Sequence, residues 1–436
     1  MDTIQKLAIL GEGAAQEHEL GAGQSTPGAT PGATPGAMPG CFTPSKLLTR
    51  EERHRNPAVS GKGRFLPGGI HVSQVGGSPR GFTTSGGRTV KLLKVLQTNV
   101  CEFDCFYCEH RASRDVPRTY VSPDELAKTF MQLHRARLVD GLFLSSGITK
   151  KVDTMQERIV QTAEILRRQY RFKGYIHLKI MPGSSPAAVE RTVQLADRVS
   201  LNLEAPTPKH LSRLSSRKEF LDGILARMVW INRITKERPG LARAGQITQF
   251  VVGAAGESDL DLLRTTDRLY REINLRRAYF SAFSPIPDTP LDHVPPAPLL
   301  RQHRLYQADW LLRFYGFSAD ELAFDEQGLL PLAADPKLAW ALRHPERFPL
   351  ELSTAPPELL LRVPGIGPLS AKRIAEIRRT TALTDLTQLT RLGVATKRAA
   401  PFLLMNGRLP ATVPPPVRRH AAQLAFWEDA MVSVGR

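Results

Sequence analysis

Three cysteines, Cys101, Cys105 and Cys108, lie within eight residues in the run NVCEFDCFYCEHR, and the chain has only one other cysteine, Cys41. The C-x3-C-x2-C spacing places three thiolates on one short loop. Three thiolates can hold three irons of a four-iron cluster and leave the fourth iron open to a small ligand. The motif therefore predicts a metal-centred reaction site, because four thiolates would more often serve plain electron transfer.

Two other interpretations of the cysteines are open at this point. The three thiolates could bind a structural zinc ion with His110 as the fourth ligand, although His110 follows Cys108 more closely than is usual in zinc modules. They could also be unligated or form a disulfide. An odd cluster in a chain whose first residues lack the order of a signal peptide argues for a reducing compartment instead.

The segments around the motif predict parallel βα units. Short apolar runs at 90–96, 141–145, 174–180, 198–203, 246–252 and 278–283 alternate with helical segments. Three of the helices begin with a capping residue followed by proline, at Ser122, Ser185 and Thr207. This pattern predicts an α/β fold built as a partial (β/α)6 barrel. The cysteine loop follows the first strand, at the barrel end where chemistry gathers.

The segment SLNLEAP at the end of the fourth predicted strand carries two polar residues, Asn202 and Glu204. Strand alternation would place both side chains on one face, opposite Leu201 and Leu203. Polar groups inside a barrel need partners. A bound ligand could supply them, and so could an internal hydrogen bond or ion pair with His177 or Lys179.

A second pattern lies near the carboxyl end, in LLLRVPGIGPLSAKRIAEIRR. The turn Gly365-Ile366-Gly367 lets the backbone approach an anion, and the following helix carries Lys372 and Arg373. A weaker copy follows at 386–402. The pattern resembles a helix-hairpin-helix motif, which binds DNA phosphates. The open alternatives are a hairpin that only packs onto the barrel, or one that binds RNA or a protein.

Composition sets outer limits on the function. The 436 residues include 59 Lys and Arg against 42 Asp and Glu, which gives a net charge of +17 and favours a polyanionic partner. No run of eighteen apolar residues predicts a membrane span. The start of the chain lacks the basic-then-apolar order of a signal peptide, so a cytoplasmic location is expected.

The domain boundaries follow from shifts in composition. Residues 1–60 are predicted to be an extension with the flexible spacer TPGATPGATPGAMPG at 26–40, beside which Cys41 is incidental. Residues 61–300 are predicted to form the barrel and 301–350 a helical connector. Residues 351–412 are predicted to form an all-α helix-hairpin-helix module, and 413–436 a tail.

The cysteine motif, with Tyr107 before its last cysteine, resembles the radical S-adenosylmethionine (SAM) superfamily. The resemblance implies a [4Fe-4S] cluster and SAM as cofactors, and a 5′-deoxyadenosyl radical as the reactive species. It places Tyr107 beside the adenine and the turn Ser145-Ser146-Gly147 beside the amino group of SAM. Here Ser-Ser-Gly replaces the more common Gly-Gly-Glu, so only the backbone role carries over. Asn202 and Glu204 would also position the cofactor.

Residues from about 88 to 408 together resemble radical SAM proteins described as DNA modification or repair enzymes with a helix-hairpin-helix end. The segments KLLKVLQTNVCEFDCFYCEHR, GLFLSSG and LLRVPGIGPLSAKRI carry this likeness. It implies DNA as a partner, an electron donor for the cluster, and an association with a protein resembling uracil-DNA glycosylase. The alternatives are a radical enzyme acting on RNA or a peptide, and a non-catalytic iron–sulfur redox sensor bound to DNA.

Overall fold

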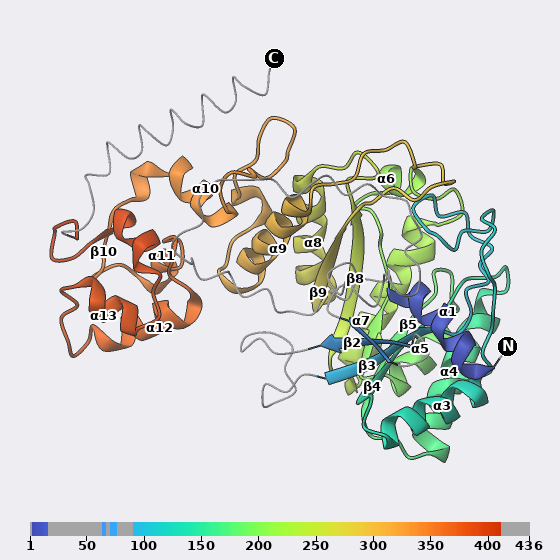
Figure 1. Ribbon diagram of the computed structural model, residues 1–436. Helices are drawn as coiled ribbons and strands as arrows, with labels where there is room; N and C mark the ends of the chain where they lie inside the picture. Colours follow the sequence, from blue (N-terminus) through green and yellow to red (C-terminus); the bar gives the residue numbers. More distant parts are fainter. Residues whose placement is uncertain (1, 16–62, 67–69, 76–89, 411–436) are drawn as a thin grey trace. The chain divides into compact units, whose positions relative to one another are not determined.

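The computed structural model describes residues 2–15, 63–66, 70–75 and 90–410 (Figure 1). The predicted spacer, Cys41 and the predicted tail lie outside these residues. The chain divides into two compact units, the first formed by Met1–Glu257 with Arg268–Ala297 and the second by Ser258–Asp267 with Pro298–Arg436. The predicted connector and hairpin module therefore lie in one unit, which also includes the beginning of a helix from the barrel region.

The first unit is built on an eight-stranded sheet with the order β1-β2-β3-β4-β5-β6-β8-β9. The six strands from β3 onward pair in parallel, which confirms the predicted partial barrel. Their bounds are β3 Val90–Leu96, β4 Gly141–Ser145, β5 Tyr175–Lys179, β6 Arg198–Ser200, β8 Gly245–Val252 and β9 Arg277–Ala282. A short strand, β7 (Pro239–Ala242), precedes β8.

Two antiparallel strands extend the sheet beyond β3, and the sequence did not predict them. Strand β1 (Gly63–Leu66) pairs with β2 (Ile70–Val75), which pairs with β3. Helix α1 (Thr3–Ala15) buries Leu7 and Leu10 in the core that the sheet shares with its helices. Part of the predicted N-terminal extension thus belongs to the barrel unit.

The predicted capping residues begin three helices as expected. Ser122, Ser185 and Thr207 each accept a backbone N–H through the side-chain oxygen, at the starts of α3 (Pro123–Arg135), α5 (Pro186–Leu195) and α6 (Pro208–Ser212). The Glu125 carboxylate accepts hydrogen bonds from Thr3 and Lys6 of α1 and so ties that helix to α3.

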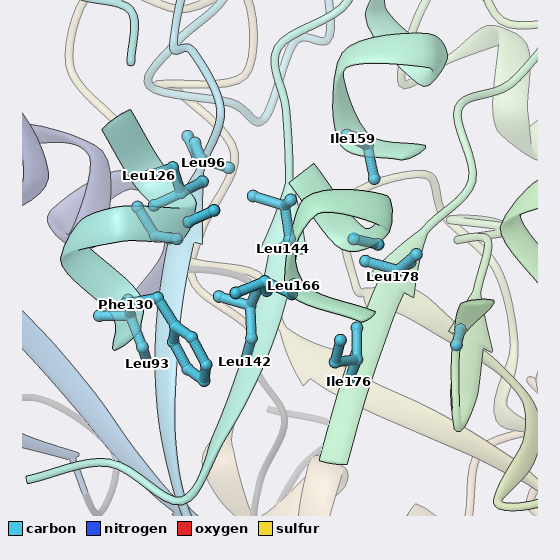
Figure 2. Close-up of a cluster of buried hydrophobic side chains, with 14 of the residues drawn as sticks. Leu93, Leu96, Leu126, Phe130, Leu142, Leu144, Ile159, Leu166, Ile176 and Leu178 are labelled. Carbon is cyan, nitrogen blue, oxygen red and sulfur yellow. The ribbon is translucent and has the colours of Figure 1, made fainter. Parts of the chain in front are cut away.

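The remaining helices of this unit are α4 (Val152–Glu164), which continues as a π-helical turn at Ile165–Gln169, a second π-helical segment at Phe220–Leu225, and α7 (Ala226–Glu237). Helix α8 (Asp259–Ile273) begins in the second unit and ends in the first. Figure 2 shows Leu142, Leu144 and Ile176 from the strands facing Phe130 of α3 and Ile159 of α4. Each fully buried side chain of this kind stabilises the fold by about 1.5–3 kcal/mol, so the strands that carry the site are firmly held.

The second unit is mainly helical. Its longer helices are α9 (Leu299–Phe314), α10 (Pro336–Arg343) and α12 (Pro368–Ile377), with shorter ones at α11 (Pro357–Leu360), α13 (Leu386–Arg391) and α14 (Thr396–Ala399). A small parallel pair, β10 (Leu350–Glu351) with β11 (Leu403–Leu404), adds to the predicted helices. Within the described ranges, no helix is both long enough and apolar enough to cross a membrane.

Candidate functional site

The cysteine loop leaves the C-terminal end of β3, as predicted, and Arg118 closes it. One guanidinium nitrogen of Arg118, Nη1, donates to the carbonyls of Asn99 (2.6 Å) and His110 (2.9 Å). The other, Nη2, donates to the carbonyls of Arg111 (2.8 Å) and Arg114 (3.0 Å). The two ends of the loop are therefore joined through one side chain that the sequence analysis did not single out.

The turn after β4 lies alongside the cysteine loop. The Gln97 amide donates to the Ser145 carbonyl (2.8 Å), and the Gly147 amide donates to the Thr98 carbonyl (2.7 Å). The next amide in the turn, that of Ile148, donates to the Sγ of Cys101 at 3.5 Å. The predicted turn residues and the predicted cluster ligands are thus brought together.

Ser146 and Gly147 have properties that suit a cofactor site. The Ser146 Oγ is buried without a hydrogen-bond partner among the described residues. A Cβ at Gly147 would lie 2.3 Å from the carbonyl oxygen of Val100, the residue before Cys101. Only glycine lets the turn approach the loop this closely.

The segment from Leu214 to Lys218, which follows α6, holds the other side of the cysteine loop. The Asp104 carboxylate accepts hydrogen bonds from the hydroxyls of Ser215 and Ser216. Burial alone would raise the pKa of Asp104, but these hydrogen bonds outweigh it and hold the pKa below its ordinary value. The Phe106 amide donates to the Leu214 carbonyl (2.8 Å). The cysteine spacing did not predict a role for this segment. The acidic residue between two of the cysteines, Asp104, could have indicated that the loop needs hydrogen-bond donors from elsewhere in the chain.

Tyr107, Glu204 and Lys218 form a buried polar group beside the loop. The Lys218 ammonium lies 2.9 Å from the Tyr107 hydroxyl and 2.9 Å from Oε1 of Glu204. The side chains of Lys218 and Glu204 are each 6% exposed. Burial, together with the Glu204 carboxylate, raises the pKa of Tyr107 well above its ordinary value, so the phenol keeps its proton. Burial alone would lower the pKa of Lys218, but the negative charges of Cys105, once ionised, and of Glu204 outweigh it and raise the pKa, which keeps the ammonium charged.

The end of the fourth parallel strand differs from the prediction. Strand β6 ends at Ser200 rather than 203, and Glu204 adopts a left-handed backbone conformation (φ 66°) while its amide donates to the Gln249 carbonyl. This turn breaks the strand alternation on which the placement of Asn202 and Glu204 depended. Glu204 pairs with Lys218 rather than with His177, whose Nε2 lies 2.8 Å from the Ser200 hydroxyl. Asn202 is half-buried and lies outside the hydrogen-bond group of Tyr107.

The three thiols fit an iron–sulfur cluster. All three are free, and the Sγ atoms of Cys101 and Cys108 accept backbone N–H groups from Ile148 and His110, as cluster sulfurs commonly do. Burial raises the pKa of Cys105 and Cys108 above the ordinary thiol value, so these groups need a bound cation to ionise. His110 offers its backbone amide to Cys108, while its imidazole Nε2 lies 3.2 Å from Glu109. This is a poor arrangement for the zinc alternative.

The second unit contains two helical hairpins that contact each other. Gly365 in the turn after α11 and Gly393 in the turn after α13 have φ angles of 89° and 85°. The Ala395 amide donates to the Gly365 carbonyl (3.0 Å), and a Cβ at Gly365 would lie 2.6 Å from the Ala395 oxygen. Apolar side chains of both hairpins are buried, namely Leu360, Val363, Ile366, Ile374, Leu389 and Val394.

The predicted cations on α12 have different surroundings from the residues of the turn. Lys372 and Arg373 are exposed, and Lys372 forms only a long, exposed pair with Glu376 at 3.8 Å. Ile366 is buried, and its carbonyl accepts a hydrogen bond from Lys337 (2.5 Å). Ile366 therefore supports the turn, while the two cations face solvent.

The buried amine of Lys337 should make the stability of the second unit depend on pH. Burial lowers the pKa of its amine from 10.5 to about 7. Between these values the unfolded chain binds the proton that the folded chain does not, so the free energy of unfolding should rise as the pH increases from about 7 to about 10. Below pH 7 the charged amine is buried, and stability is lowest. We expect thermal unfolding of the full chain to show this rise.

The matched comparison is between Lys337→Met, which should remove the pH-dependent rise, and Lys397→Met, which changes an exposed lysine in the same unit. The latter should keep the rise. An unchanged pH profile in Lys337→Met would show that the buried amine is not its source.

Comparisons with known proteins bear on the barrel unit. Residues 95–269 match the family model of the radical SAM superfamily. No curated protein matches the chain. Among solved structures, the HydG maturase of FeFe-hydrogenase from Carboxydothermus hydrogenoformans shares 15% identity, with a TM-score of 0.39 and coverage of 50% of each chain. The chain thus spans about half of that structure's length.

Two further solved structures are similar at the same level. Methylornithine synthase (PylB) shares 15% identity, with a TM-score of 0.41, over 50% of this chain and 60% of that one. A radical SAM methyltransferase from Sphaerobacter thermophilus shares 14% identity, with a TM-score of 0.40, over 61% of this chain and 80% of that one.

The family match includes the cysteine loop, the turn after β4 and the Tyr107–Glu204–Lys218 group, which are the parts of the barrel that lie together in the structure. The cofactors of this superfamily are a [4Fe-4S] cluster and SAM, and the free thiols and the unpartnered Ser146 hydroxyl suit them. Residues 95–269 therefore form a radical SAM domain.

Proposed function

We propose that this enzyme modifies or repairs a nucleotide in DNA and holds its substrate through a helix-hairpin-helix module in the second unit. The observation that carries the proposal is the pair of hairpins whose turns contain glycines in the left-handed conformation. The first hairpin turn is followed by helix α12, which has exposed cations. Lys372 and Arg373 lie on that helix, and both hairpins belong to the same chain as the radical SAM domain. The net charge of +17 agrees with a polyanionic substrate.

The proposed contacts are to the phosphate backbone. Gly367 allows close approach of a phosphate to the turn, which Gly365 shapes by packing against Ala395 of the second hairpin. Helix α12 begins directly after Gly367, so its first amides and its positive end point toward that turn. Lys372 and Arg373 add charge without reading bases. Ile366 acts indirectly, because its side chain is buried and its carbonyl accepts a hydrogen bond from Lys337, which supports the turn.

In the barrel unit, the proposed chemistry depends on a buried site. The bound cofactors supply the 5′-deoxyadenosyl radical when the cluster is reduced. The chain's own residues hold the cluster through Cys101, Cys105 and Cys108, and position SAM through Tyr107 and the 145–147 turn. A base inside a duplex could not enter such a site, so the target nucleotide would leave the stack.

The proposal includes two protein partners. A one-electron donor must reduce the cluster, since the chain itself supplies no electron. A protein resembling uracil-DNA glycosylase would act in the same repair or modification pathway, on the basis of the sequence resemblance.

The test of DNA recognition is equilibrium binding of the loaded enzyme to duplex DNA over a series of salt concentrations. Replacing Lys372 and Arg373 together with alanine should weaken binding by about tenfold or more at moderate salt. It should also make the slope of log K against log salt shallower by about 0.9 for each phosphate that the protein no longer neutralises.

A matched control exists in the barrel unit. Arg233 and Arg268 form exposed i,i+4 pairs with Glu237 and Glu272, as Lys372 does with Glu376. Replacing both of these arginines with alanine removes the same charge and should leave the salt slope nearly unchanged. Equal losses of affinity in the two double variants would mean that net charge alone binds DNA. Tighter binding of a structured RNA than of DNA at fixed salt would favour an RNA substrate.

A further inference from the structure

Lys218 places a buried positive charge beside the cysteine loop, and the family assignment gives it no role. Its ammonium is within 2.9 Å of the hydroxyl of Tyr107, the residue that directly precedes Cys108. The ammonium also lies 5.5 Å from the centre of the Tyr107 ring. Its side chain is 6% exposed, so water screens the charge poorly.

The position of Lys218 is fixed by the contacts of its neighbours. Leu214, Ser215 and Ser216 bind the backbone of Phe106 and the carboxylate of Asp104. Arg217 donates to the Glu102 carbonyl at 2.6 Å. Five consecutive residues therefore follow the cysteine loop, and these bonds fix the backbone from which the Lys218 side chain reaches Tyr107 and Glu204.

Glu204 is the third member of this buried group, and its carboxylate is paired with the ammonium of Lys218. The carboxylate holds Lys218 at 2.9 Å and is equally buried, and its left-handed backbone turn brings it to this position. Removing the lysine would leave an unpaired carboxylate near the loop, while removing the carboxylate would leave an unpaired ammonium. The two changes act on the loop with opposite sign.

We propose that Lys218 is a positioning residue that raises the reduction potential of the cluster by holding a buried positive charge beside the Tyr107–Cys108 end of the cysteine loop. The step concerned is the one-electron reduction of the cluster by an external electron donor. No bond at Lys218 forms or breaks, and the ammonium keeps its proton. A nearby buried cation stabilises the added electron, and the surroundings of a cluster are known to set its potential.

The experiment is a redox titration of the reconstituted full chain without SAM, followed by electron paramagnetic resonance. Lys218→Met should lower the ratio of reduced to oxidised cluster at a fixed potential by about tenfold, which corresponds to a midpoint about 59 mV more negative for one electron. Lys218→Arg keeps the charge and should stay close to the unmodified protein. Glu204→Gln should shift the midpoint in the positive direction.

Lys209→Met is the matched control, because it removes an exposed ammonium on α6 of the same unit. It should shift the midpoint by much less than Lys218→Met. The proposal is overturned if Lys218→Met retains the cluster with an unchanged midpoint, or if Lys209→Met shifts it equally. Should Lys218→Met fail to bind iron, Glu204→Gln decides the matter: a positive shift supports the proposal, and an unchanged or negative midpoint overturns it.

Discussion

Replacing Gly147 with alanine should prevent the protein from holding its iron–sulfur cluster. The added Cβ would lie 2.3 Å from the oxygen and 2.9 Å from the carbon of the Val100 carbonyl, and both atoms are backbone. No side-chain rotation can relieve such a contact, so the turn must move away from the cysteine loop. Cys101 follows Val100 directly and would be displaced with it. We expect iron bound per chain after anaerobic reconstitution to fall at least severalfold.

Gly141→Ala is the control for this prediction. It lies at the other end of β4, and its Cβ would meet the Tyr175 carbonyl oxygen at 2.6 Å, far along the strand from the cysteine loop. Both variants should lower the temperature of unfolding, since crowding of this kind costs about 1–3 kcal/mol. Only Gly147→Ala should lose iron. Similar iron contents in the two variants would show that the close contact at Gly147 does not place the cysteines.

Replacing Arg118 with methionine is the second change expected to have a large effect. Four backbone carbonyls, on both sides of the cysteine motif, would lose their donor. A buried acceptor left unpaired costs about 1–3 kcal/mol, and these partly buried carbonyls would lose less each. We expect a large loss of bound iron and faster amide hydrogen exchange across residues 99–114. Arg118→Lys should retain only part of the bound iron, because an ammonium lacks the planar guanidinium group that donates to two pairs of carbonyls.

Arg167 provides a comparison within the same unit. Its guanidinium donates to the carbonyls of Phe172, Gly174 and Leu195 and to the Asp197 carboxylate, away from the cysteine loop. Arg167→Met should destabilise the barrel while preserving the iron content of the protein that remains folded. If both arginine variants lose iron to the same extent, the effect of Arg118 is general destabilisation and not support of the loop.

The sequence predicted the parts of the barrel that depend on local patterns. The six parallel strands and the caps at Ser122, Ser185 and Thr207 follow from apolar runs and from a capping residue before proline. The cysteine spacing identified the centre of the site. Each of these features depends on a few neighbouring residues, so it can be recognised in a single sequence.

The features that the sequence analysis missed depend on contacts between distant segments. Lys218 and Arg118 have their roles only because the fold brings them to Tyr107 and to the ends of the cysteine loop. The alternation argument for Glu204 failed because β6 ends early and the backbone turns left-handed there. Strands β1 and β2 were missed because their region is rich in glycine, proline and arginine, and their partner is the edge of β3.

The most direct test is the formation of 5′-deoxyadenosine by anaerobically reconstituted and reduced protein, with and without DNA. We expect product that requires Cys101, Cys105 and Cys108 and that increases when DNA is added. The increase should be larger for mismatched or single-stranded DNA than for a matched duplex, because the target base must leave the stack. Product that does not respond to DNA would contradict the proposed substrate. No product from protein with a complete cluster, with DNA present, would contradict the radical reaction itself and favour a DNA-bound redox sensor.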